Sequence, residues 1–90
     1  MEFTWDLRKA ATNARKHGVS FDEAVTAFFD ALNTTIPDPD HSLGEQRFLL
    51  LGRSTTGRLL VVAHLDSGTS IRIISARKAN PHERKAYQAR

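Results

Sequence analysis

The order of apolar and polar positions divides the chain into a helical first third and a strand-rich remainder. Asp6 precedes good helix formers over residues 9–16, and Gly18 stands where a left-handed glycine ends a helix. Ser20 and Glu23 have the spacing of a capping box, which starts a second helix. Apolar residues then recur at helical spacing, so both segments are predicted to be helices.

Strand-like segments follow a polar loop at residues 37–45, whose prolines and acidic residues argue against a regular element. Turn residues separate the segments, as in consecutive hairpins. Asn80, Pro81 and Glu83 then open a last helix as its N-cap, first and third residues. Strands are predicted over residues 33–36, 46–53, 58–66 and 70–77.

This order predicts an α+β fold: two N-terminal helices, a four-stranded antiparallel meander and one C-terminal helix, in a single domain over residues 1–90. We expect the helices to cover one face of the sheet and to leave the other partly open. Phe3 and Trp5 form either an N-terminal strand or a staple under the fold. A chain of 90 residues buries about 60–65% of its unfolded surface, so a partner would stabilise it.

The length of each hairpin turn determines on which face of the sheet several strand side chains lie. In the simplest first hairpin, Arg47 and the other odd-numbered residues up to Arg53 share a face with His64. In the second hairpin, a two-residue turn sets His64 opposite Ile71, and a three-residue turn sets it opposite Arg72. One residue of slip moves every side chain to the other face, so the sequence leaves both arrangements open.

The net charge of +3 is unevenly distributed. Residues 21–46 contain six acidic residues and no Lys or Arg, whereas residues 71–90 contain six Lys or Arg against Glu83. The asymmetry indicates either a polyanionic partner, with nucleic acid first, or a solvated basic tail. The absence of cysteine excludes disulfides and thiolate metal sites, and the apolar runs are too short to span a bilayer, so we expect a cytoplasmic protein.

Arg72 is an informative charge because it lies between Ile71 and Ile73 in an apolar strand. A buried charge without a partner is costly. Arg72 therefore either faces a ligand anion or forms a structural bridge with Glu83 or Asp66. If the ligand is a phosphate, the arginine fork suits it, because it binds phosphate oxygens in pairs.

Other side chains that could take part in catalysis or binding also have two interpretations. His64 is either a proton carrier or a packing histidine. Lys16 and His17 end the first helix, where cations stabilise the helix dipole or contact phosphate. Arg84 and Tyr87 lie three apart on one helix face. The acidic loop matches no metal-ligand spacing, and nucleotide-binding and zinc motifs are absent, so we expect no cofactor and no metal.

A family pattern runs in the same order along nearly the whole chain. It consists of Trp5-Asp6, Lys9, Asn13, Lys16-His17-Gly18, Val19 to Ala24, Ile36-Pro37-Asp38, Ile71 to Ala79, and Glu83-Arg84 with Tyr87. With this pattern the chain resembles the BrnT toxin family. The resemblance implies a fold related to RelE-like ribonucleases and RNA cleavage that halts translation. It also implies a BrnA-like ribbon-helix-helix antitoxin, operator DNA bound through that antitoxin, and a heterotetramer of paired toxin and antitoxin chains.

RNA cleavage without a metal needs a base for the 2′-hydroxyl, cations for the phosphorane and an acid for the leaving 5′-oxygen. As catalytic groups we expect Arg72 and Arg77 at the phosphate, and His64 as the proton carrier with Glu83 second. The residues expected to bind RNA are Lys16, His17, Lys78, Arg84 and Tyr87. Two alternatives are a non-catalytic nucleic-acid-binding module that represses the operon with the antitoxin, and a structural interaction protein.

Overall fold

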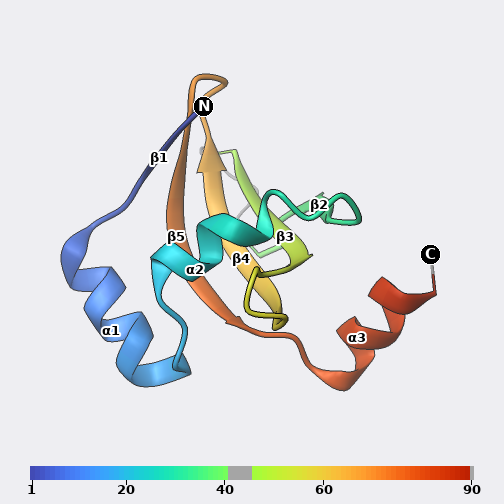
Figure 1. Cartoon of the computed structure of the whole chain (residues 1–90). Coiled ribbons are helices and arrows are strands. Elements are labelled where there is room, and N and C mark those ends of the chain that lie inside the picture. Colours follow the sequence, from blue (N-terminus) through green and yellow to red (C-terminus); the bar gives the residue numbers. More distant parts are fainter. Residues whose placement is uncertain (41–45, 90) are drawn as a thin grey trace.

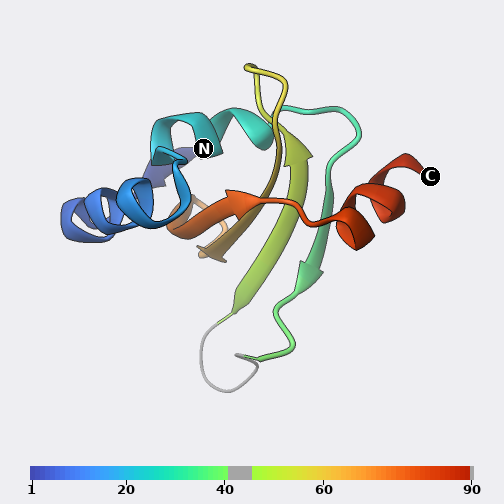
Figure 2. The same ribbon diagram turned by 90° about the horizontal axis from the view of Figure 1, so that it is seen from below.

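The computed structural model describes residues 1–40 and 46–89, and Figures 1 and 2 show it in two views. None of the helices in these ranges is long and apolar enough to cross a membrane. The elements, in chain order, are β1 (Glu2–Thr4), α1 (Leu7–His17), α2 (Phe21–Ala27), β2 (Thr34–Pro37), β3 (Arg47–Arg53), β4 (Leu59–Asp66), β5 (Ser70–Lys78) and α3 (Pro81–Gln88).

The strands form a mixed sheet in the order β1-β5-β4-β3-β2. β1 runs parallel to β5, and the other neighbouring pairs are antiparallel. In the described part of the chain the sheet has five strands, so the prediction of a four-stranded antiparallel meander was wrong. The additional strand contains Phe3, for which a strand was one of two predicted alternatives. It has three residues, too few to show a clear period of two along the sequence.

Helices lie on both sides of the sheet (Figure 2). α3 packs on the side opposite α1 and α2, where Tyr87 and Ala79 contact Leu59 and Val61. The expectation that all helices cover one face was therefore wrong, because this second face is also apolar and α3 removes part of it from water. The core between the first face and α1–α2 contains Val19, Phe21, Ala24, Ala27, Leu50, Leu60, Val62, Ile71, Ile73 and Ala76. We call the two sides the α2 face and the α3 face.

The local signals that start α1 and α3, and the one that ends α1, are confirmed. The Asp6 carboxylate accepts hydrogen bonds from the Arg8 and Lys9 N–H groups, at 2.7 and 3.1 Å. Gly18 ends α1 with φ at +68°, a conformation that favours glycine. At α3 the capping box is complete: the Glu83 N–H donates to the Asn80 side chain and the Asn80 N–H donates to the Glu83 carboxylate, both at 2.8 Å. Short sequence motifs therefore predicted correctly where α1 and α3 begin.

Glu23 departs from the predicted capping box at α2. Its N–H donates to the Ser20 hydroxyl at 3.0 Å, as expected. Its carboxylate, however, accepts from the Ser54 and Thr56 hydroxyls at 2.7 and 2.6 Å and forms an ion pair with Arg58. The Arg58 hydrogen bond in particular lowers the pKa of Glu23 to about 2. The carboxylate therefore fastens α2 to the β3–β4 turn instead of closing the cap.

The first hairpin has a register one residue away from the predicted one. Residues 55–57 form its loop, so Arg53 pairs with Leu59 and Phe48 pairs with His64. His64 consequently shares the α2 face with the even-numbered residues of β3. The expectation that His64 faces the same side as Arg53 was wrong, because a three-residue loop shifts the pairing by one position.

The second hairpin has neither of the two registers considered. Asp66 pairs with Ile71, one position beyond the three-residue alternative, and the Ser67 N–H donates to the Ser70 carbonyl where the chain reverses. His64 then lies opposite Ile73, and Arg72 lies opposite a residue of the α3 face. His64 and Arg72 therefore point to opposite sides of the sheet.

Candidate nucleic-acid interface

α1 runs beside the edge of β5, and the Asn13 side chain joins the two elements. β1 pairs with β5 as far as Arg72. Further along, the Asn13 amide donates to the Ala76 carbonyl at 2.8 Å and its oxygen accepts from the Ala76 N–H at 3.0 Å. The amide also donates to the Val19 carbonyl at 2.9 Å. This buried side chain thus takes the place of a neighbouring strand and fixes α1 against β5.

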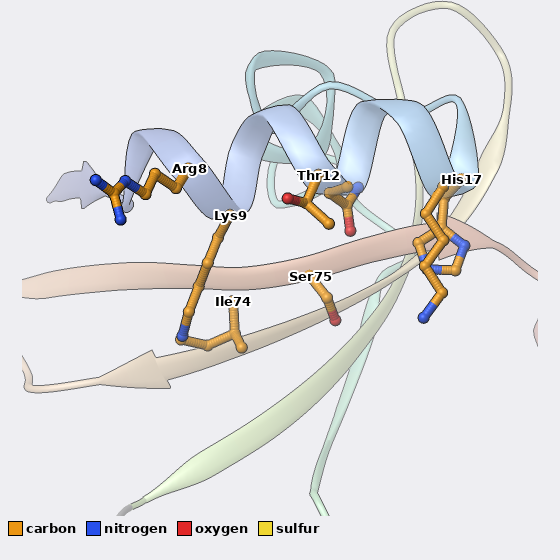
Figure 3. A pocket seen from close by; sticks show the side chains of 8 residues that line it. Arg8, Lys9, Thr12, His17, Ile74 and Ser75 are labelled. Carbon is orange, nitrogen blue, oxygen red and sulfur yellow. The ribbon is translucent and has the colours of Figure 1, made fainter.

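A groove of about 300 Å³ lies between α1 and β5 (Figure 3). Arg8 and Lys9 stand toward one end of it, His17 stands at the other, and Thr12 and Ser75 lie between them. The helical residues share one face of α1 because they recur three to four positions apart. The lining residues are Arg8, Lys9, Thr12, Asn13, Lys16, His17, Ile74 and Ser75. We call this the α1–β5 groove.

The α1–β5 groove is cationic. Arg8, Lys9 and Lys16 line it, and none of the lining residues just given is acidic. His17 is half-buried in the last turn of α1. At the other end of α1, the Asp6 carboxylate is held by helix N–H groups, which lower its pKa. Cations with hydroxyl groups between them suit the sugar–phosphate backbone of a nucleic acid.

A β-bulge in β5 sets the two predicted phosphate ligands on one face. Arg72 and Arg77 are five positions apart, which in a regular strand would place them on opposite faces. The pairing of β5 with β4 shifts by one residue around Ile74, which is the extra residue of the bulge. Arg72, Ser75 and Arg77 therefore all lie on the α3 face, next to the α1–β5 groove.

Arg77 pairs with Glu83, the second predicted proton carrier. Both terminal nitrogens of Arg77 donate to the carboxylate at 2.9 Å. These bonds lower the pKa of Glu83 and raise that of Arg77. The Arg77 side chain remains 41% exposed, so part of its guanidinium faces solvent. Arg77 and Glu83 are thus brought together, and Arg72 lies exposed on the same face.

The structure places His64 away from these groups. It lies on the α2 face with 3% of its surface exposed. Its ring centroid lies 4.9 Å from that of Phe28 and 5.8 Å from that of Phe48. Burial lowers the pKa of His64, which favours the neutral imidazole. The sheet therefore separates His64 from Arg72 and from Arg77.

Tyr87 faces the sheet from α3 and holds the helix in place. Its hydroxyl donates to the Asp30 carboxylate at 2.6 Å, which raises the pKa of Tyr87. The Arg53 guanidinium lies 5.4 Å from the centre of its ring. Lys78 and Arg84 are exposed at the surface. RNA contact by these residues stays a prediction, and the surroundings of Tyr87 give it a structural part as well.

Arg8, Lys9, Thr12 and Ser75 were not among the predicted site residues. The three α1 residues had a signal in the sequence, because they recur with Lys16 on one face of the predicted helix. Ser75 had none, since its facing depends on the bulge. Periodicity of charge along a helix is therefore as useful as periodicity of apolar residues.

The acidic loop is described in part. The Asp38 carboxylate accepts from the Asp40 N–H at 3.0 Å, an ordinary turn contact. His41 and Glu45, whose side chains could also ligate a metal in this loop, lie outside the described residues. Within residues 1–40 and 46–89, no three His, Asp or Glu side chains are grouped to hold a metal ion.

One family model matches most of the chain. A family profile described as "Ribonuclease toxin, BrnT, of type II toxin-antitoxin system" matches residues 5–83. The fold is similar to that in the 1.1 Å crystal structure of the Brucella abortus ribonuclease toxin, BrnT. That match has a TM-score of 0.64 and 23% identity, and it covers 89% of this chain and 97% of the other. A search of curated proteins gave no significant match.

Proposed function

The chain belongs to the BrnT family of ribonuclease toxins of type II toxin–antitoxin systems, and we propose that it cleaves RNA without a metal ion and so inhibits translation. The proposed RNA site combines the α1–β5 groove with Arg72 and Arg77 on the adjoining α3 face. The cationic lining of this groove, with no acidic residue among the described side chains that form it, is the observation that supports the proposal most directly. A cytoplasmic location follows for a toxin that acts on cellular RNA.

The two arginines suit a reaction at phosphorus. In the proposed reaction the 2′-oxygen attacks the adjacent phosphorus, the bond to the 5′-oxygen breaks, and a cyclic phosphate is left on the first fragment. A guanidinium stays charged and stabilises the phosphorane with paired hydrogen bonds. Arg72 and Arg77 are separated by roughly 16 Å of strand at about 3.3 Å per residue, so one of them stabilises the phosphorane while the other holds a different phosphate of the same RNA strand.

Three side chains are candidates for moving the proton. His64 was favoured by the sequence, but it is buried on the α2 face. The Glu83 carboxylate is held by Arg77, and its lowered pKa makes it a weaker base. His17 lines the α1–β5 groove and is half-buried. We therefore place the proton transfer at His17, which takes the 2′-hydroxyl proton and returns it to the leaving 5′-oxygen, with Glu83 second.

The remaining cations are proposed to guide the RNA backbone. Arg8, Lys9 and Lys16 do so inside the α1–β5 groove, and Lys78 and Arg84 do so from exposed positions on either side of the β5–α3 turn. Such contacts with phosphate are independent of base sequence and weaken as salt rises. Binding by this surface is therefore expected to be strongly salt-dependent.

The proposal includes the antitoxin. A type II system pairs its toxin with a protein antitoxin. We propose that this partner is a BrnA-like ribbon-helix-helix protein, that operator DNA is bound through it, and that paired toxin and antitoxin chains form a heterotetramer. The cationic surfaces described above favour a partner that presents acidic side chains.

Incubation of the purified protein with single-stranded RNA, with and without EDTA, tests the proposal. We expect cleavage to survive EDTA and to fall by about 100-fold or more in His17→Asn, the usual size of a lost acid–base group. His64→Phe is the matched control, because it removes a buried imidazole and keeps a ring between Phe28 and Phe48. Thermal unfolding establishes that each variant is folded.

Three other results would contradict parts of this proposal. Wild-type cleavage by folded His17→Asn would remove this histidine from the mechanism. Loss of cleavage with EDTA would contradict the metal-free scheme. RNA that is bound but left intact by the wild-type protein would support the non-catalytic binding module instead.

A further inference from the structure

The α3 face carries a second, apolar groove of about 220 Å³. β2, β3 and β4 form its floor, and α3 forms its wall. Its lining contrasts with that of the α1–β5 groove, because most of the side chains are aliphatic. They are Thr34, Ile36, Leu49, Leu51, Val61, His82, Glu83 and Ala86. We call this the α3 groove.

The rim of the α3 groove is exposed. Ile36 is 51% exposed although it is a large apolar residue, and Ala86 is also exposed on the wall. β2 is the last strand in the sheet order and pairs with β3 along one side. Exposed apolar side chains on an edge strand favour association with another chain. The surface is thus suited to a protein partner and poorly suited to RNA.

The dimensions of the floor indicate what kind of segment fits. Neighbouring strands are about 4.8 Å apart, so the distance from β2 to β4 is roughly 10 Å, the diameter of one α-helix. Tyr87 and the Arg77–Glu83 pair anchor α3 at one side of this floor. One further helix laid beside α3 would therefore fill the width of the groove.

The charges around the α3 groove restrict the partner further. Arg72 and Arg77 lie on the same face, along the neighbouring strand β5. Arg84 and Lys85 are exposed on α3 itself. Residues 71–90 contain six Lys or Arg and a single acidic residue, Glu83, which is paired with Arg77. A complementary helix is therefore apolar on the side that meets the floor and acidic along its flanks.

We propose that the α3 groove is the docking site of the antitoxin, which inserts the apolar side of an acidic amphipathic helix beside α3. This inference rests on the proposed function, because the toxin–antitoxin family supplies the protein partner. The helix extends toward β5 and covers Arg72 and Arg77. Neutralisation then follows from exclusion of RNA from the α3 face, while the apolar contacts beside Ile36 hold the complex together.

Two substitutions at the rim test the site without opening the core. Ile36→Asp places a charge over the apolar floor, and Ala86→Arg fills the groove from α3. The matched control is Phe29→Asp, which changes an apolar side chain that is 74% exposed just beyond α2. Calorimetric titration uses the full-length toxin and the antitoxin encoded beside its gene. We expect Kd to rise at least about tenfold in both rim variants and to stay unchanged in the control.

RNA cleavage by the same proteins separates this inference from the proposed function. Ile36→Asp is expected to cleave at the wild-type rate while escaping neutralisation. Unchanged antitoxin affinity in both rim variants would overturn the site. So would a loss confined to Lys16→Ala in the α1–β5 groove, or self-association of the free toxin that Ile36→Asp abolishes. If no variant cleaves RNA but the rim variants still lose the antitoxin, the proposed function fails and the docking site stands.

Discussion

Each face of the sheet has an ion pair between a glutamate and an arginine, but the two pairs have different surroundings. On the α2 face, Glu23 meets Arg58 and two hydroxyl groups, and its side chain is 13% exposed. On the α3 face, the Glu83 carboxylate meets Arg77 and the Asn80 N–H, its side chain is 24% exposed, and Arg77 lies beside other exposed cations. A network whose groups are occupied stabilises the fold, whereas a half-exposed pair keeps donors available for a ligand. The two carboxylates thus differ in burial and in the number of side-chain partners, and a role of the Arg77–Glu83 pair in RNA binding stays a prediction.

The largest loss of stability is expected where α1 meets β5. Asn13→Ala removes three buried hydrogen bonds and leaves the Ala76 N–H and two carbonyl groups without this partner. We expect the free energy of unfolding to fall by about 2–4 kcal/mol, measured by urea denaturation. Thr12→Ala, on the exposed side of the same helix, is the control and is expected to cost about 0.5 kcal/mol or less. Equal effects of the two changes would mean that the Asn13 hydrogen bonds contribute nothing to the stability of the contact between α1 and β5.

The next largest effect concerns the α2 face and acid. The pKa of Glu23 is about 2 in the folded protein and 4.5 in the unfolded reference. A lowered carboxylate pKa stabilises the fold above the unfolded value and loses that contribution as pH falls from 4.5 toward 2. Glu23→Gln is expected to cost about 1–2 kcal/mol near pH 7. Urea titrations near pH 7 and near pH 3 measure the difference, which shrinks in acid; a cost that is constant with pH would contradict the role of the charge.

The smallest effect on stability is expected on the α3 face. Arg77→Ala removes a partly exposed ion pair but leaves the capping bond between Asn80 and Glu83, so we expect a cost below about 1 kcal/mol. RNA affinity, in contrast, should fall, and the slope of log K against log salt should decrease by about 0.7 per lost contact with a single strand. Filter binding at several salt concentrations measures both quantities. A stability loss as large as that of Glu23→Gln, with unchanged RNA affinity, would erase the contrast between the faces.

The sequence predicted those parts of the fold that depend on neighbouring residues. Asp6, Gly18, Ser20 and Asn80 marked helix ends because caps act within a few positions. The features that depend on residues distant in sequence were not predicted. The carboxylate of Glu23 found Arg58 across the fold, and the parallel strand β1 depends on a partner near the other end of the chain. Both contacts join residues that are far apart in sequence, and local helix and strand propensities contain no information about such partners.

The candidate site shows the same division. Lys16 and His17 were predicted from a local motif, and the structure places both in the α1–β5 groove. Whether Arg72 and Arg77 share a face depends on one bulge residue, Ile74, and the facing of His64 depends on the length of a turn. A side-chain period of two makes each such inference sensitive to a single inserted residue. Register therefore sets the limit of site prediction in a sheet protein of this size.

The contact between Asn13 and Ala76 joins residues 63 positions apart, and β1 likewise pairs with β5 near the far end of the chain. The α1–β5 groove consequently forms only after residue 76 has left the ribosomal exit tunnel, since an emerging chain folds only with the segments already made. During its own synthesis the toxin holds one wall of the groove without the other. Until β5 has been made, α1 is present without the strand that completes the groove, so the proposed RNA site is absent from the growing chain.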